Sequence, residues 1–219
     1  MDLVQDFTAD RKRLNRAVDR LWARGSTRLY EAIAEALEKI RDGRHKKKAI
    51  LLITNGKDTA SQVSLKEVLS LARRAEVLVY ALGIGHGKSG FFGHVLRRSR
   101  DDEVDMRILD ALAEATGGHS YFLEEAHSEG GDKIDMACVE VSAELRQQYT
   151  LGYYPSSKTK DGKYRKIRVT TRNPAYVVRS KEGYFAPNAN GFKLIAAKKR
   201  DVESLIRLEP IISLFDGDE

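Results

Sequence analysis

The sequence has 219 residues, of which 42% are hydrophobic and 32% are charged, and its formal net charge is +6. This composition is typical of a globular protein and excludes wholesale disorder, while the length allows one ordinary domain and an appendage. No apolar run approaches the roughly 20 residues that a membrane-spanning helix needs. The first residues, MDLVQDFTADRKR, lack a basic segment followed by an apolar one, so we expect no signal peptide in this chain.

The sequence contains local clusters of basic residues at 44–48, 97–98 and 198–200. Solvated loops and helix ends explain such clusters, because the helix dipole favours cations near a helix C-terminus. No nucleic-acid-binding motif and no basic surface interleaved with aromatic residues is visible. We therefore expect no nucleic-acid partner.

Helical and strand patterns alternate from Thr8 onward, which predicts a parallel sheet with helices on its faces. Thr8 is the expected N-cap of a first helix. The apolar residues at helical spacing in this helix are Leu14, Val18, Leu21 and Trp22. A second helix follows Gly25-Ser26 and ends near Gly43, and its expected core stripe is Leu29, Ile33, Leu37 and Ile40.

Two continuous apolar runs predict buried strands. Ala49 to Thr54 is the first and Val77 to Ile84 is the second, and each is typical of a strand that is covered on both faces. Between them, Ser64 and Glu67 form a capping box that starts a helix. These segments predict two parallel strands that are connected by one crossover helix.

The alternation continues to a last amphipathic helix. Asp105 is expected to cap a helix that ends at Gly117-Gly118, before a short strand from His119 to Leu123. A final apolar stripe then follows at helical spacing: Ile134, Cys138, Val141 and Leu145. Cys138 is the one cysteine, so it cannot form an internal disulfide, and its place on this stripe predicts a core residue.

Composition changes after Gln148. All four prolines lie beyond it, and Tyr164 to Thr171 and Ala175 to Ser180 have the pattern of strands separated by turn residues. We therefore expect a partial doubly wound α/β domain over residues 1–147 and a small β-rich extension over 148–187. A linker and tail would follow over 188–219, where Val202, Leu205 and Ile206 predict a short helix.

No motif of an enzyme active site is complete. Residues 83–90, GIGHGKSG, follow a strand, but three residues separate Gly83 from Gly87 where a phosphate-binding loop requires four. Ser89 lacks the Gly-x-Ser-x-Gly frame of a hydrolase. No metal-ligand spacing relates the five histidines, which are His45, His86, His94, His119 and His127. We expect no catalytic activity; a hydrolase or a nucleotide-binding enzyme is the alternative.

Two polar segments, GSTRLY at residues 25–30 and TNGKDT at residues 54–59, are candidates for a binding site. In an open parallel sheet, the loops at the C-terminal ends of the strands and the adjacent helix starts form the ligand crevice. Thr27 and Asn55 could meet there. Taken alone, both segments serve equally well as helix caps and turns.

Eight segments follow one another along the chain: QDFTADRKRL, GSTRLYEAI, KAILLITNGKDTAS, VLVYALGIG, LAEATGGHSYF, ELRQQYTLGYYP, DGKYRKIRV and VRSKEGYFAP. In this order they resemble the bacterial VWFA-related proteins, whose core is a von Willebrand factor type A domain. The resemblance covers Val4 to Pro187. It implies a doubly wound α/β domain with a metal-ion-dependent adhesion site, which holds Mg²⁺ or Mn²⁺ when intact and which binds proteins instead of catalysing a reaction.

The departures from this family affect the metal site. The family's first strand, its Asp-x-Ser-x-Ser loop, the next helix and the second strand have no counterpart, because the chain opens at what resembles the third strand. Thr27 matches the family's metal-binding Thr, but Asn55 occupies the position of the Asp in the Thr/Ser-Asp-Gly motif. Asp58 does not match a ligand position, and we expect it to make a turn contact. The resemblance therefore predicts a protein-protein interaction module of the adhesion type with a degenerate metal site and no metal cofactor.

In the family, the absent first strand pairs with the strand that corresponds to Ala49 to Thr54. This strand would then have an open edge, which recruits further strands unless something covers it. Three possibilities remain: Leu3 to Phe7 pairs there, a partner chain or a second copy supplies the strand, or the chain is a truncated fragment without independent function. Family members are often exported, and the sequence leaves the compartment open.

Overall fold

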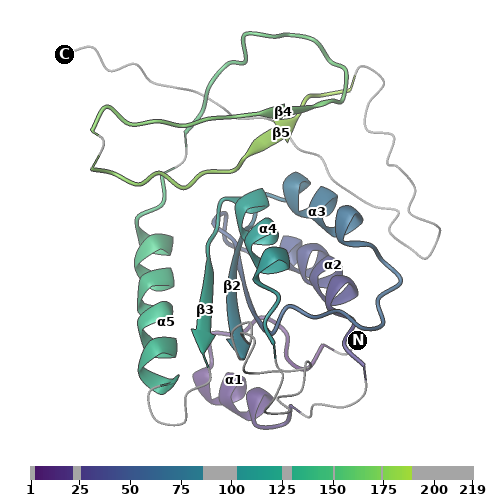
Figure 1. The fold of residues 1–219 in the computed structure, drawn as a ribbon, viewed down its shortest axis with the longest axis vertical. Coiled ribbons are helices and arrows are strands. Elements are labelled where there is room, and N and C mark those ends of the chain that lie inside the picture. Colours follow the sequence, from purple (N-terminus) through teal and green to yellow (C-terminus); the bar gives the residue numbers. More distant parts are fainter. Residues whose placement is uncertain are drawn as a thin grey trace, which may run out of the picture.

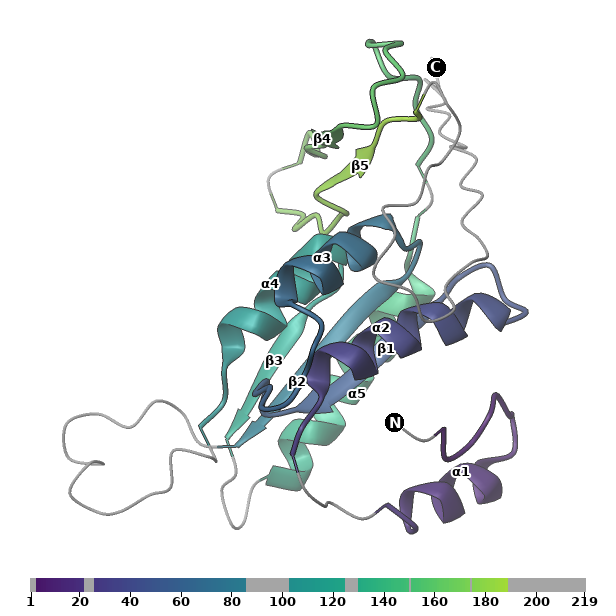
Figure 2. The ribbon, with the colours of Figure 1, turned by 90° about the vertical axis from the view of Figure 1, so that its right-hand side faces the viewer.

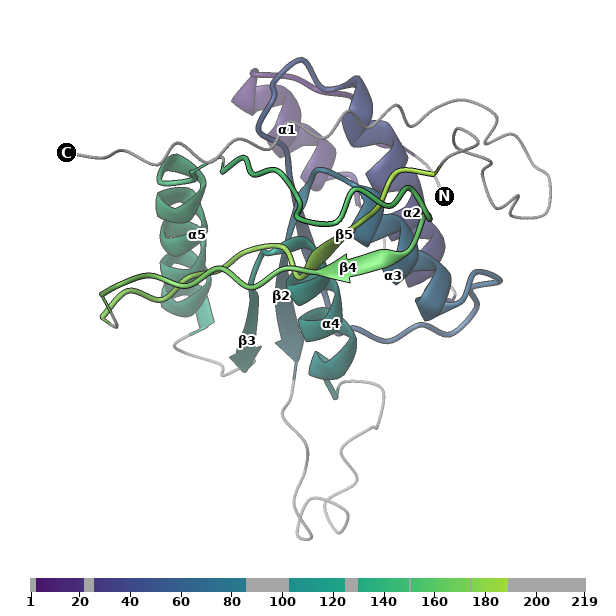
Figure 3. The same ribbon diagram turned by 90° about the horizontal axis from the view of Figure 1, so that it is seen from above.

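The computed structural model describes residues 3–21, 26–85, 103–124, 130–149, 151–173 and 175–188. Its centre is a parallel sheet of three strands in the order β1 (Ala49–Thr54), β2 (Leu78–Gly85) and β3 (Ser120–Glu124). Three helices lie on one side of the sheet: α2 (Leu29–Lys39), α3 (Leu65–Arg74) and α4 (Met106–Thr116). The helix α5 (Gly130–Arg146) lies on the other side (Figures 1 and 3). The predicted α/β class is therefore confirmed.

The main hydrophobic core lies between the sheet and the three helices α2, α3 and α4. Its buried members are Leu29, Ile33, Leu37, Val68, Ala72, Val79 and Leu112. Full burial of one such large side chain stabilises the fold by about 1.5–3 kcal/mol. The core stripe predicted for the second helix is confirmed at three of its four positions, since Ile40 belongs to the short 3₁₀ turn η1 (Ile40–Asp42) that follows α2.

Local capping signals set the element boundaries where they were predicted. Ser64 and Glu67 form the capping box of α3, and the Asp105 carboxylate accepts the Arg107 amide at the start of α4. Helix α4 ends at Gly117, whose φ of 80° lies in the left-handed region that glycine adopts without strain. Strand β1 has the predicted bounds, and β2 and β3 are each shifted by one residue.

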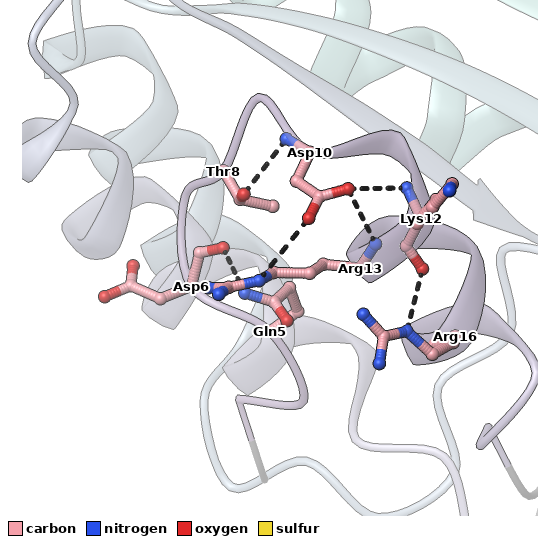
Figure 4. Close-up of polar contacts among 7 residues, drawn as sticks. All are labelled: Gln5, Asp6, Thr8, Asp10, Lys12, Arg13 and Arg16. Atoms are coloured by element: carbon pink, nitrogen blue, oxygen red, sulfur yellow. Dashed lines mark hydrogen bonds and ion pairs between the residues drawn. The ribbon is translucent and has the colours of Figure 1, made fainter.

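Helix α1 (Arg11–Val18) differs from the prediction at its cap and on its apolar face. Asp10 is the N-cap, because its carboxylate accepts the amides of Lys12 and Arg13, whereas the Thr8 hydroxyl accepts the Asp10 amide (Figure 4). No residue of α1 is buried. The predicted apolar positions Leu14, Val18 and Leu21 are therefore exposed. Trp22 lies outside the described residues.

The prediction that β1 is covered on both faces is wrong. Leu51 and Ile53 are 47% and 59% exposed. Because side chains alternate along a strand, these two residues share the sheet face on which α5 packs. Helix α5 packs there against Leu82 of β2 and Leu123 of β3, and this contact leaves Leu51 and Ile53 of β1 uncovered.

The prediction that Cys138 is a core residue is also wrong, because Cys138 is exposed. Ala137 is buried in its place, in a cluster with Ile134, Leu82 and Leu123. The predicted positions Ile134 and Val141 do face the sheet, so the prediction fails at Cys138 alone, where the neighbouring Ala137 is the buried residue.

The residues after α5 form an antiparallel pair of short strands, β4 (Tyr164–Lys166) and β5 (Gly183–Phe185), at one end of the α/β layers (Figures 1 and 2). The strand predicted over residues 164–171 is thus shorter than expected. The strand predicted over 175–180 is wrong, since residues 183–185 pair instead. The predicted tail, from residue 189 onward, lies outside the described residues.

Contacts with α3 and its C-terminal end hold this extension in place. The Lys181 ammonium donates a hydrogen bond to the Ala75 carbonyl at 2.9 Å, which satisfies an acceptor at the C-terminal end of α3. The Arg74 guanidinium lies 3.9 Å from the centre of the Phe185 ring, a cation–π contact. An ion pair of 3.7 Å joins Arg73 to Glu182.

Candidate functional site

The first part of the candidate site is the loop that leaves the C-terminal end of β1. Strand β1 ends at Thr54, and the Asn55 carbonyl accepts the Asp105 amide at 2.8 Å, which joins this loop to the start of α4. Gly56 follows with a φ of 77°, and a Cβ at this position would lie 2.6 Å from the Asp105 carbonyl oxygen. Glycine is therefore required here, both for its conformation and for the close approach to the backbone of residue 105.

The two predicted polar segments do meet. The Thr27 amide donates to the Thr59 hydroxyl at 2.8 Å, and the Thr27 carbonyl accepts the amides of Thr59 and Ala60 at 2.9 and 3.1 Å. Among the described residues, none hydrogen-bonds the Thr27 hydroxyl, which is the group that the family resemblance assigns to a metal. The backbone of Thr27 thus fixes the loop, while its side chain stays at the surface.

Asp58 has a structural role that the sequence analysis missed. Its Oδ1 atom accepts the Leu29 amide at 2.7 Å and the Tyr30 amide at 3.4 Å. Arg28 supplies no side-chain cap to α2, so Asp58 satisfies amides that the helix leaves unpaired and places a negative charge at its positive end. The expected turn contact is also present, because Oδ2 accepts the Ser61 amide at 3.1 Å. The sequence contained one signal for this role: arginine is a poor N-cap residue, so Arg28 indicates that the amides at the start of α2 need an acceptor from another segment.

Glu31 ties the same loop to α2 from the other side. Its Oε1 atom accepts the amides of Gln62 and Val63 at 2.5 and 3.4 Å. Burial alone would raise the pKa of the Glu31 carboxyl, but the hydrogen bonds from Ser61, Gln62 and Val63 outweigh burial and hold the pKa below its ordinary value. The loop after β1 is therefore held by carboxylates that bond to backbone amides.

The donor set at this edge of the sheet does not fit a site for Mg²⁺ or Mn²⁺. These hard cations require oxygen ligands with anionic charge among them. The Asn55 amide oxygen accepts the Lys57 amide at 3.1 Å, Asp58 caps α2, and the Asp105 carboxylate binds the Arg107 guanidinium at 2.9 Å. In the described part of the chain, no group of three or more His, Cys, Asp or Glu side chains is placed to hold a metal ion.

The second candidate is the outer edge of β1. Within the described ranges, β1 pairs with β2 and with no other strand. Residues 3–7 form no strand, so the possibility that they pair with β1 is wrong. They lie instead against α2, where Asp6 pairs with the Lys39 ammonium at 3.2 Å and that ammonium lies 5.6 Å from the centre of the Phe7 ring. Figures 2 and 3 place α1 on the β1 side of the sheet.

Three of the solved structures that this chain matches are from Bacteroides and Vibrio species. The conserved hypothetical protein BatB from Bacteroides thetaiotaomicron is 17% identical, with a TM-score of 0.41 over 62% of this chain and 71% of that one. An aerotolerance-related membrane protein from Bacteroides fragilis NCTC 9343 is 15% identical, with a TM-score of 0.41 over 60% and 71%. A membrane-spanning protein from Vibrio fischeri is 24% identical, with a TM-score of 0.34 over 61% and 67%.

A comparison with curated proteins gave no significant match. Among the described helices, none has the length and apolar character that crossing a bilayer demands. The sequence model of the von Willebrand factor type A domain matches residues 2–135, which is more than half of the 219 residues. The chain therefore belongs to the von Willebrand factor type A domain family.

Proposed function

We propose that this chain is a non-catalytic protein-interaction module of the adhesion type, with a degenerate metal site, and that it binds through the open edge of β1. Domains of the von Willebrand factor A type are in general protein-interaction modules, and this chain belongs to that family. The observation that carries the more specific proposal is an edge of β1 with which no described strand pairs, combined with exposed Leu51 and Ile53.

An open edge presents backbone N–H and C=O groups that a further strand can pair with, as in recognition by strand addition. The Leu78 amide donates to the Lys48 carbonyl at 3.1 Å, which fixes the direction in which the β1 backbone groups point. Groups of residues 48, 50, 52 and 54 point toward β2 by alternation, so those of Leu51 and Ile53 point outward. The same two residues supply the apolar side chains of the proposed binding surface.

The proposed interaction does not depend on a metal ion. Thr27 would offer a neutral hydroxyl and Asn55 a neutral carbonyl, and neither supplies the anionic charge that Mg²⁺ or Mn²⁺ needs. The Asp58 carboxylate bonds to the start of α2, and moving it to a metal would leave the Leu29 amide without its acceptor. These arguments favour a surface that recognises a strand of a protein partner, or of a second copy, by backbone pairing.

Light scattering coupled to size exclusion tests this proposal, with a second copy as the available partner. Ile53→Lys places a charge on the open edge, so it should abolish self-association without unfolding a residue that is already 59% exposed. Val139→Lys is the matched control, because Val139 is 66% exposed on α5. Self-association that is lost in both variants, or retained in both, would contradict the proposed edge.

A further inference from the structure

Positive charge is concentrated in the extension. Residues 148–187 contain nine Lys or Arg against two Asp or Glu, a net charge of +7, although the whole chain carries only +6. The α/β domain and the tail together are therefore close to neutral. A segregated charge of this kind creates a positive potential over one part of the molecule, which attracts anionic partners.

Some of the cations in the extension have structural partners. Arg165 donates to the carbonyls of Ser157 and Thr159, Arg179 pairs with Glu144, and Lys181 binds the Ala75 carbonyl. The others are exposed, and no hydrogen bond or ion pair of their side chains is found within the described residues: Lys158, Lys160, Lys163, Lys166, Arg168 and Arg172. The structure thus separates cations that hold the fold from cations that face solvent.

Three of the six exposed cations lie at the end of β4 or on the segment that leaves it. Lys166 and Arg168 alternate with the half-buried Ile167 and Val169, so they share one side of the chain that leaves β4, and Arg172 follows at a bend of the same segment. Side chains two residues apart on an extended chain are separated by about 6.6 Å. Figure 1 shows this segment running outward from β4 as a long arm. A row of cations on an extended arm suits a linear polyanion.

Exposed aromatic rings share the extension with these cations. Tyr149, Tyr154 and Tyr176 are 89%, 90% and 67% exposed. Other tyrosines of the extension pack internally, since the Tyr153 ring contacts the Tyr184 ring at 6.2 Å. An exposed ring offers a flat apolar face on which a nucleic-acid base can stack. Exposed aromatic side chains therefore flank the exposed cations along the sequence of the extension, with Tyr149 and Tyr154 before them and Tyr176 after them.

We propose that the extension binds single-stranded nucleic acid, with the exposed cations on its phosphates and the exposed tyrosines stacked on its bases. An acidic peptide would use the cations but not the rings. Binding to a bilayer requires apolar side chains gathered on one face, whereas the exposed aromatic and apolar side chains of the extension are divided between two separate stretches of sequence, 149–154 and 176–178. Phosphate contacts and stacking carry no sequence preference, so the binding is independent of base order.

Fluorescence anisotropy with labelled oligothymidylate and oligouridylate, on the full chain and over a range of salt concentrations, tests the proposal. The variant K166Q/R168Q/R172Q removes three proposed phosphate contacts. The slope of log affinity against log salt should then become shallower by about 2, because each contact to a single strand contributes about 0.7. The control K12Q/R16Q/R20Q removes the same charge from exposed positions in α1 and the turn after it, and its slope should match that of the unmodified chain.

Stacking is tested separately with Tyr154→Leu, which should weaken binding about tenfold and leave the salt slope unchanged. Circular dichroism checks that each variant is folded. Absence of binding at low salt, or an equal loss in the α1 control, would overturn the proposal. Competition by polyglutamate or by vesicles of anionic lipid as strong as that by the oligonucleotide would overturn it as well, and would assign the surface to an acidic protein or to a membrane.

Discussion

The carboxylate of Asp58 caps the helix that begins at Leu29, with 2.7 Å between Oδ1 and the Leu29 amide nitrogen. The two residues are 29 positions apart in the sequence, so one hydrogen bond links the loop after β1 to the start of α2. Asp58 lies close in sequence to Asn55, which occupies a metal-binding position of the family, but its carboxylate accepts a hydrogen bond from the start of α2. The interaction ties the stability of the domain to the loop in which Asn55 lies.

Asp58→Ala should therefore lower the free energy of unfolding by about 1–2 kcal/mol, the usual contribution of a helix N-cap. Asp58→Asn should cost less, because an amide oxygen can still accept the Leu29 amide. Urea unfolding measures both changes. Asp135→Ala on the exposed surface of α5 is the control and should stay within about 0.5 kcal/mol of the unmodified chain; an equal effect of Asp58→Ala and Asp135→Ala would remove the assigned role of Asp58.

Titration calorimetry with Mg²⁺ and Mn²⁺ should show no one-to-one binding of useful affinity to the unmodified chain. Asn55→Asp should also fail to create a tight site, since it restores one carboxylate while Thr27 remains a neutral ligand. A one-to-one isotherm with micromolar affinity for Mg²⁺ or Mn²⁺ in the unmodified chain would disprove the proposal that the metal site is degenerate.

His119 should make stability depend on pH. Burial, with a smaller effect of the Arg179 charge, lowers the pKa of His119 below its ordinary value of 6.5. Below that pH the unfolded chain binds a proton that the folded chain does not, so the free energy of unfolding decreases as the pH falls through this range. Urea unfolding at neutral and at mildly acidic pH should show a smaller decrease for His119→Gln. Identical pH dependence in the two proteins would exclude this role.

Lys181 should control how firmly the extension is attached to α3. Lys181→Ala removes the bond to the Ala75 carbonyl, and hydrogen exchange of the Ile167 amide, which donates to the Glu182 carbonyl, should accelerate. Amides in the core of α4 should be unaffected. Lys160→Ala is the control because Lys160 is exposed. Equal exchange at Ile167 in both variants would show that Lys181 does not hold the extension.

The sequence predicted those elements whose signals are local. The capping box of Ser64 and Glu67, the left-handed Gly117 and the apolar run of β1 each act within a few residues, and all three are present in the structure. Pairing between distant segments was harder to predict. Strand β5 forms at residues 183–185, where Gly183 lies beside the backbone of Arg165, a contact that no local pattern reveals.

Burial was predicted less well than secondary structure, because burial depends on what covers each surface. Leu51, Ile53 and the apolar residues of α1 have the patterns of core residues, yet they are exposed. For the candidate site, the sequence indicated that the segments around Thr27 and Asn55 meet, and they do. The cap supplied by Asp58 was missed because its helix begins 29 residues earlier in the chain.

Hydrogen exchange of the Leu51 and Ile53 amides, followed by nuclear magnetic resonance, tests the central claim most directly. These amides point away from β2 and should exchange rapidly in dilute protein, where the edge is open. They should become protected at high concentration, or when a partner strand is added, while the amides of Ile50 and Leu52 change little. Rapid exchange of Leu51 and Ile53 under every condition, in a chain that stays monomeric, would contradict the account.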